Sequence, residues 1–278
     1  MREIGIFFTA TLLEALRKRI LLAALLLGAG FLLVFGIGFS FVFRETSADP
    51  SFPMAHRALL YTYLTLAGLY ATHFLVSMTA AFLPVDTISG EITSGVAQTV
   101  VSKPIRRSSV VLGKWLAYCV VLAGYLALLG GGVLLVARVI GGITPPGVPH
   151  GLSLMLLEGT VLLTVSVAGG TRLTTLATGM TVFGLFGIAF LGGWIEQIAT
   201  FMGNETARYV GTVASLVLPT EALWQRAAYV MQPSVLRDLT MTPFSPASVP
   251  SAAMVWWALL HVSCVLGLAV RWYSRREL

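Results

Sequence analysis

Six long apolar runs constrain the fold of this chain more than any other feature of its sequence. Each run matches the roughly 20 residues that an α-helix needs to cross the hydrocarbon core of a membrane. Only 11% of the 278 residues are charged, too few to coat a surface that faces water, so lipid must be the main solvent. We therefore predict an all-α, polytopic membrane protein. Its six transmembrane helices are expected at about residues 20–42, 58–84, 111–137, 152–171, 174–196 and 253–271.

The first apolar run is preceded by a candidate amphipathic helix at residues 1–19. Ile4, Phe8, Leu12 and Leu16 recur every four residues, which places them on one face of a helix. Such a helix is expected to lie along the membrane interface. A signal peptide fits less well, because the following run is long enough to span the membrane and no small-residue cleavage site ends it.

Residues 197–252, between the last two runs, are too numerous for a simple turn. Two apolar stretches within them, 210–218 and 222–231, are too short to cross a membrane. Thr220 is a candidate N-cap for the second stretch, and Glu221 is well placed in its first turn. We predict two short extracytoplasmic helices that dip into the outer leaflet or cover the mouth of a pathway.

Lysine and arginine are shared unequally between the two predicted membrane faces. Of the 18 such residues, twelve lie at the face that carries both termini. The other six are Arg44, Arg57, Arg138, Arg208, Arg226 and Arg237. The richer face is normally cytoplasmic. We therefore expect a multi-pass protein of the inner (cytoplasmic) cell membrane with both termini in the cytoplasm. The same bias explains the net charge of +6 better than a nucleic-acid partner does.

A polar segment at residues 85–110 separates the second apolar run from the third. A short helix is expected over residues 91–101. Such a rigid polar helix outside the lipid would let a soluble partner protein move the membrane helices. Its β-branched residues make the helix propensity modest. Pro104 then suits a turn, and Ser108 is a candidate cap for the third span. Along the chain the segment and its flank carry Gly90-Glu91, Gly95, Val100-Val101, Ser102-Lys103-Pro104, Arg106-Arg107 and Leu112-Gly113-Lys114.

This order of motifs resembles the cytoplasmic coupling region of ABC type-2 transporter permeases. It departs from the family pattern at Gly95-Val96-Ala97, where Gly-Thr-Leu is common. The resemblance implies one permease domain over residues 1–278, whose coupling region docks on a separate ATPase subunit, in a complex of two permeases and two ATPases. It places five residues at or near the ATPase interface: Asp86, Glu91, Arg106, Arg107 and Lys114. A solvated cytoplasmic connection that only follows the charge bias is the alternative interpretation.

A second segment, Leu218-Pro219-Thr220-Glu221-Ala222-Leu223-Trp224, also resembles part of a known family. The similarity is to the permease branch associated with maturation of multicopper enzymes, such as the copper-site assembly permeases of nitrous oxide reductase. Membership of that branch would add a periplasmic partner to the expected complex.

The sequence contains no phosphate-binding loop of the form G-x-x-x-x-G-K-[ST]. Gly113-Lys114-Trp115 lacks both the first glycine and the hydroxyl residue of that motif. We therefore expect that the chain is not an enzyme and binds no cofactor itself. On the family resemblance, ATP and Mg²⁺ would be bound by the partner ATPase.

Three polar residues lie within or near the predicted spans: Glu158, Arg138 and His73. A carboxylate facing lipid at the depth of Glu158 would cost about 2.5–3.5 kcal/mol, so it should face protein or water. Glu158 either forms a structural ion pair with Arg138 or lines a pathway. His73 is either a hydrogen-bonded core histidine or a contact for substrate or metal. Cys119 and Cys264 lie in apolar runs, and their spacing predicts no metal site.

These features favour the transmembrane permease subunit of an ATP-binding cassette exporter. It would couple ATP hydrolysis by its partner to substrate export or to work on a periplasmic protein. Two other classes stay open. An ion-coupled secondary transporter needs buried titratable groups, for which Glu158 and His73 are the candidates. A non-transporting membrane scaffold for an assembly complex needs neither these groups nor the charges of residues 85–110. A second permease copy and membrane lipid are expected partners, and nucleic acid is not.

Overall fold

The structure is a computed structural model that describes residues 2–49, 51, 53–95, 106–234 and 249–276. The described residues form α-helices and no strand, which confirms the predicted all-α class. The helices are α1 (Arg2–Arg17), α2 (Arg19–Ala48), α3 (Met54–Phe82), α4 (Val85–Thr93), α6 (Arg107–Gly141), α7 (Val148–Arg172), α8 (Thr175–Phe201), α9 (Glu205–Val217), α10 (Thr220–Met231) and α12 (Ala252–Arg275).

Six helical segments are long and apolar enough to cross a membrane, as the apolar runs predict. They correspond to α2, α3 with α4, α6, α7, α8 and α12, and they define a multi-pass membrane protein. Most of these helices continue past the apolar run itself, because backbone hydrogen bonding extends into the polar flanks. At the far end of α6 a left-handed glycine, Gly142 with φ 66°, ends the helix and donates its N–H to the carbonyl of Ala137.

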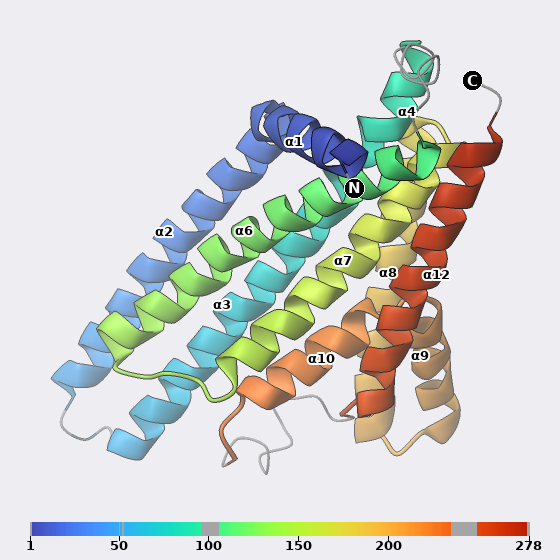
Figure 1. Ribbon diagram of the computed structural model, residues 1–278. Helices are drawn as coiled ribbons and strands as arrows, with labels where there is room; N and C mark the ends of the chain where they lie inside the picture. Colours follow the sequence, from blue (N-terminus) through green and yellow to red (C-terminus); the bar gives the residue numbers. More distant parts are fainter. Residues whose placement is uncertain (1, 50, 52, 96–105, 235–248, 277–278) are drawn as a thin grey trace.

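The bundle is layered around α7, which contacts α3, α6, α10 and α12 (Figure 1). Most of α7 is buried, whereas α2 and α12 lie at the outside and expose most of their side chains. The exposed apolar side chains of α2 include Leu22, Leu26, Leu27, Leu33, Val34 and Ile37. In a membrane protein such a face contacts lipid or another membrane helix.

The first helix, α1, lies across one end of the bundle and packs closely on α6 (Figure 1). The contact requires a glycine, because a Cβ at Gly113 would lie 2.7 Å from the Cβ of Phe7 and 2.9 Å from the carbonyl oxygen of Ile4. Ala15 of α1 is buried in the core, whereas Leu16 is 61% exposed and is left free for the membrane interface. A four-residue spacing drifts by about 40° per step around a helix, so the last member of the series has turned away from the first.

The start of α1, the end of α12 and helix α4 all lie at the same end of the bundle (Figure 1). An even number of spans requires this arrangement of the termini. We call this end of the molecule the terminal end.

Helix α4 follows α3 after the two-residue break Leu83-Pro84. Proline has no N–H to donate, and its ring crowds the carbonyl four residues earlier, which accounts for the break. The described helix α4 starts at Val85 and ends at Thr93, so of the helix predicted over residues 91–101 only the first three residues are helical before the turn at Ser94-Gly95. Residues 96–101 lie outside the described part of the chain. Gly95 follows with φ 76°. The predicted turn at Ser102-Lys103-Pro104 lies outside the described residues.

The two short helices predicted between the last two spans are present as α9 and α10. α9 packs on α8, and α10 packs on α7 in the half of the bundle away from the termini (Figure 1). Both predicted caps are wrong. Thr220 is the first residue of α10 and follows Pro219, while Ser108 lies inside α6, which begins at Arg107. Hydroxyl residues near a predicted boundary mark it only to within a residue or two.

Candidate functional site

A cluster of charged and hydroxyl side chains joins α1, α4 and α6 at the terminal end. Its centre is Lys18, whose Nζ donates to Oδ1 of Asp86 at 2.6 Å, to Oγ1 of Thr87 at 3.0 Å and to the hydroxyl of Tyr118 at 3.1 Å. The hydroxyls of Thr87 and Tyr118 also contact each other. The carboxylate of Glu14 lies 3.5 Å from the same ammonium group. We call these five residues the Lys18 cluster.

The charge state of Lys18 follows from these contacts. Burial lowers the pKa of its ammonium group, but Tyr118 and Asp86 outweigh burial, so the net shift is upward from the ordinary value of 10.5. A raised folded-state pKa means that this stabilisation is fully present at neutral pH. It is lost only as the pH rises past the ordinary value and through the folded-state pKa.

A second ion pair ties α4 to α6. The Nζ of Lys114 contacts the carboxylate of Glu91 and donates to the carbonyl oxygen of Thr87 at 3.1 Å. The Lys114 side chain is only 4% exposed, whereas Glu91 is 29% and Asp86 is 47% exposed. A buried charge needs a close partner, so Lys114 depends on Glu91 for its stability. Both acidic residues of α4 still show part of their carboxylates to solvent.

The other two predicted interface residues lie at the same end but make different contacts. Nη1 of Arg107 donates to the carbonyl oxygens of Tyr273, Ser274 and Arg276, at 3.4, 3.1 and 2.7 Å, and so holds the end of α12. The Arg106 side chain is exposed, and its backbone N–H donates to Glu3 at 3.4 Å. The structure therefore brings Asp86, Glu91 and Lys114 together around α4 and places Arg106 and Arg107 beside α1 and α12.

Sequence reasoning missed Lys18, Glu14 and Tyr118 as members of the cluster around α4. Lys18 lies in the Arg17-Lys18-Arg19 run, which was counted only toward the charge bias, and its extended backbone between α1 and α2 places it beside α4. Tyr118 lies one helical turn after Lys114, a weak signal that it faces the same cluster, although its immediate neighbours Ala117 and Cys119 are apolar. Only the packing of α6 on α4 explains its role.

Inside the bundle, His73 and Glu158 form a buried pair between α3 and α7. Nδ1 of His73 is hydrogen-bonded with Oε2 of Glu158 at 2.8 Å, and Oγ of Ser77 donates to Oε1 at 2.7 Å. Both side chains are almost fully buried. Glu158 thus faces protein, and His73 is a hydrogen-bonded core histidine, one of the two roles its position suggests.

The predicted partner of Glu158 is wrong, because Arg138 is exposed and takes no part in the pair. The two residues lie at different depths along the bundle, which the prediction did not take into account. Arg138 lies three residues from the end of α6, and Glu158 lies ten residues after the start of α7. At 1.5 Å per residue these positions differ by roughly 10 Å along the bundle.

A second carboxyl, Glu221 of α10, lies near the His73–Glu158 pair. Its side chain is buried against α8, where Gly193 leaves no room for a Cβ. Oε2 of Glu221 and Nε2 of His73 make no hydrogen bond to the described residues. The ring of Trp224, one turn of α10 further on, stacks on His73 with centroids 4.8 Å apart.

This cluster holds two buried carboxyls and one imidazole. Burial disfavours a charged carboxylate unless an opposite charge lies close to it. The imidazolium of His73 can neutralise only one of the two, so the arrangement favours one neutral carboxylic acid. Chemically, the cluster can hold and release protons inside the bundle. Sequence reasoning treated Glu221 only as a helix-start residue, because its burial depends on how α10 packs.

Among the described residues, no group of three or more His, Cys, Asp or Glu side chains is arranged to hold a metal ion. Cys119 is half-buried and Cys264 is exposed, and neither forms a disulfide.

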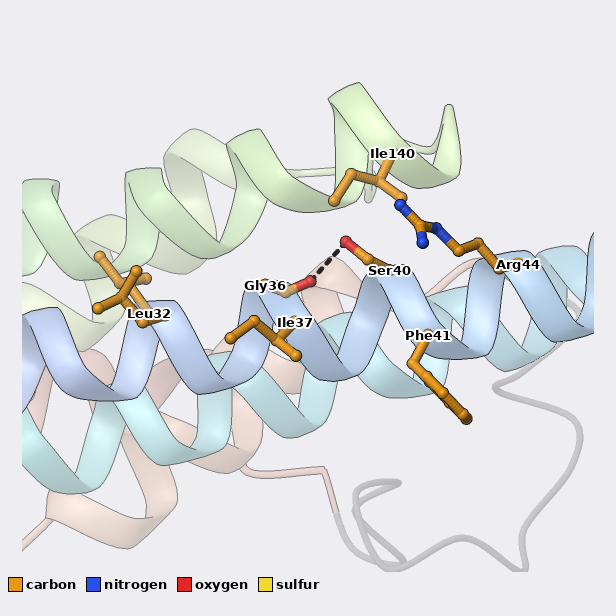
Figure 2. A pocket seen from close by; sticks show the side chains of 8 residues that line it. Leu32, Gly36, Ile37, Ser40, Phe41, Arg44 and Ile140 are labelled. Atoms are coloured by element: carbon orange, nitrogen blue, oxygen red, sulfur yellow. Dashed lines mark hydrogen bonds between the residues drawn. The ribbon is translucent and has the colours of Figure 1, made fainter.

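The outer face of α2 carries a groove of about 490 Å³ beside α6 (Figure 2). Its lining is mainly apolar, with Leu32, Gly36 and Ile37 at one end and Arg44 beside Ile140 at the other. The hydroxyl of Ser40 is already satisfied, because it donates to the carbonyl oxygen of Gly36 at 2.7 Å. A single cation over an apolar groove provides no catalytic arrangement.

A scan of this chain against protein-family models finds no match, and a search of curated proteins finds no significant relative. The class of the protein is thus defined by its fold, as a multi-pass, all-α membrane protein.

Proposed function

We propose that this chain is the transmembrane permease subunit of an ABC exporter. The observation that carries the proposal is the attachment of α4. This short polar helix is held to the junction between α1 and α2 by the Asp86–Lys18 pair and to α6 by the Glu91–Lys114 pair. A force applied to α4 would therefore reach a long membrane helix and the helix that crosses the end of the bundle.

The charge distribution supports the same proposal. The terminal end carries most of the lysines and arginines of the chain, so it is proposed to be cytoplasmic. A separate ATPase subunit would dock on the half-exposed acidic residues of α4, and ATP and Mg²⁺ would be bound there. Charges of this kind act mainly on steering and register rather than on raw affinity. A second permease copy and substrate export, or work on a periplasmic partner, complete the proposal.

The test is purification of the chain from detergent-solubilised membranes, with identification of co-eluting subunits and an ATPase assay on the eluate. We expect a nucleotide-binding subunit to co-elute and to hydrolyse ATP. A monodisperse, folded preparation that carries no such subunit would overturn the proposal.

A second candidate function, an ion-coupled secondary transporter, is favoured by one observation, the buried cluster of His73, Glu158 and Glu221. Carboxyl and imidazole groups inside a membrane bundle are typical of proton pathways. In sealed vesicles without nucleotide, a secondary transporter would respond to an imposed pH gradient, and Glu158→Gln would abolish the response. An ABC permease without its ATPase would not respond.

A further inference from the structure

Three arginines and a tryptophan line a cavity at the terminal end, where α7 and α12 both finish. The lining residues are Arg172, Trp272, Arg275 and Arg276, and the cavity measures about 290 Å³. It shares no residue with the Lys18 cluster.

The walls of the cavity are held in place by contacts within the protein. Arg276 donates to the carbonyl oxygen of Thr171, and its own carbonyl accepts from Arg107 at 2.7 Å. The guanidinium of Arg172 lies over the Trp272 ring, 5.5 Å from its centroid. Such cation–π contacts fix the guanidinium plane while its N–H groups stay available.

The positive charge in this cavity has no anionic partner among the described residues. The ion pairs of those residues belong to Lys18, His73 and Lys114. The carboxyl ends of α7 and α12 offset part of the charge, but each amounts to only about half of an elementary charge. Counted over the described residues, the three guanidinium groups give the cavity a net positive charge.

The position of the cavity points to the lipid headgroup layer. The outer face of α12 is apolar and exposed along its length, at Trp256, Leu259, Leu260 and Leu268. Trp272 and Arg275 follow at the end of that face. Tryptophan prefers the membrane interface, and basic pockets between helices at the cytoplasmic side bind anionic headgroups.

We propose that this cavity binds the phosphate of an anionic phospholipid, with Arg172 and Arg275 as the donors and Trp272 against the glycerol backbone. Guanidinium groups suit a phosphate because they can donate two parallel hydrogen bonds to it. An acidic segment of a protein partner fits less well, because the cavity ends a lipid-facing helix. The site is independent of the proposed transport function.

The experiment compares lipid binding by the wild type, R172Q/R275Q and R138Q/R208Q. The control pair removes the same charge from the opposite end of the bundle, where Arg138 and Arg208 are both exposed. Each detergent-purified protein is titrated with phosphatidylglycerol or phosphatidylcholine, and bound lipid is counted by native mass spectrometry. We expect R172Q/R275Q to bind phosphatidylglycerol about 30-fold more weakly, and the control to bind as the wild type does. Phosphatidylcholine binding should be weak in all three.

Several outcomes would overturn the proposal. Equal phosphatidylglycerol binding by R172Q/R275Q and the wild type is one. Equal loss in the control pair is another, since it would make the effect one of net charge. Displacement of the lipid by millimolar inorganic phosphate would identify a soluble anion as the ligand. Loss of a co-purifying protein with lipid binding unchanged would identify a protein partner. If the double variant fails to fold, Arg275→Gln alone is the replacement, because the Arg275 side chain is exposed and makes no hydrogen bond or ion pair with the described residues.

Discussion

At the scale of single residues, the dependence of Lys114 on Glu91 is the strongest constraint in the structure. Lys114 is nearly inaccessible to solvent and has one anionic partner, whereas Lys18 has two carboxylates and two hydroxyls around it. A lysine with several partners tolerates the loss of one, and a lysine with a single anionic partner does not.

This difference predicts unequal effects of two conservative exchanges. Glu91→Gln leaves the Lys114 cation buried beside a neutral amide. It should therefore lower the free energy of unfolding by an amount near the lower end of about 3–5 kcal/mol. Asp86→Asn removes a half-exposed carboxylate from Lys18, which keeps its other partners. It should therefore lower the free energy of unfolding by about 1 kcal/mol or less. Thermal unfolding midpoints in detergent at neutral pH measure both. Equal midpoints for the two variants would contradict the assignment.

Glu158 has a similar role inside the bundle, because it is hydrogen-bonded with two buried side chains. Glu158→Leu leaves His73 and Ser77 without that hydrogen-bond partner. We expect it to lower the free energy of unfolding by roughly 2–5 kcal/mol. Glu158→Gln is the matched control, since its amide oxygen can still accept from one donor, and it should cost less. The same unfolding assay compares them, and a leucine variant as stable as the glutamine variant would refute the pairing.

At the scale of helices, the close contact of α1 with α6 fixes the geometry of the terminal end. The contact depends on the absence of a side chain at Gly113. Gly124, eleven residues later on the same helix, faces open space instead. The two glycines therefore separate a packing effect from an effect on helix propensity.

Gly113→Leu should push α1 off α6 and expose the bonds after Arg17, Lys18 and Arg19 to trypsin, while Gly124→Leu should not. Limited digestion of the purified protein, followed by the rate at which the first 17 to 19 residues are released, measures the difference. Release at the same rate from both variants would show that α1 is not held by this contact.

The helices also show where prediction from the sequence succeeds and where it fails. The six spans were predictable because a run of about 20 apolar residues is a local property. The bounds of α4 were not, because the β-branched stretch after Glu91 gives no clear helix signal and the break at Pro84 starts the helix earlier.

At the scale of the whole molecule, the contacts that make the candidate sites join residues far apart in the sequence. Lys18 meets Asp86 and Tyr118, and His73 meets Glu158. Residue types and spacing along one helix identify candidates, but which helices face each other is decided by packing. That is why Glu158 was recognised as important while its partner was wrongly assigned to Arg138.

The bundle places two kinds of polar group in different regions. The terminal end holds the ion pairs of α4 and the arginine cavity, while the buried carboxyl cluster lies within the bundle among α3, α7 and α10. In the proposed exporter, work would enter at α4 and reach the interior through α6 and α7. Helix α10 contacts both α7 and α8, so its packing would change if these two helices moved relative to each other.

The most direct test of the central proposal is a charge exchange at α4. Glu91→Lys alone would set two lysines against each other, but E91K with K114E restores the ion pair while it reverses the charge that faces solvent. The matched control is E205K with R208E, an exchange of two exposed residues of α9 at the other end of the molecule. The measurement is the amount of ATPase subunit retained by each purified variant, together with its ATPase rate. We predict that the α4 exchange stays folded and monodisperse but loses the ATPase subunit, with a lowered unfolding midpoint because a carboxylate at position 114 cannot donate to the carbonyl oxygen of Thr87. The control should keep both the wild-type midpoint and the subunit. Full retention of an active ATPase by the α4 exchange would contradict the coupling role of α4.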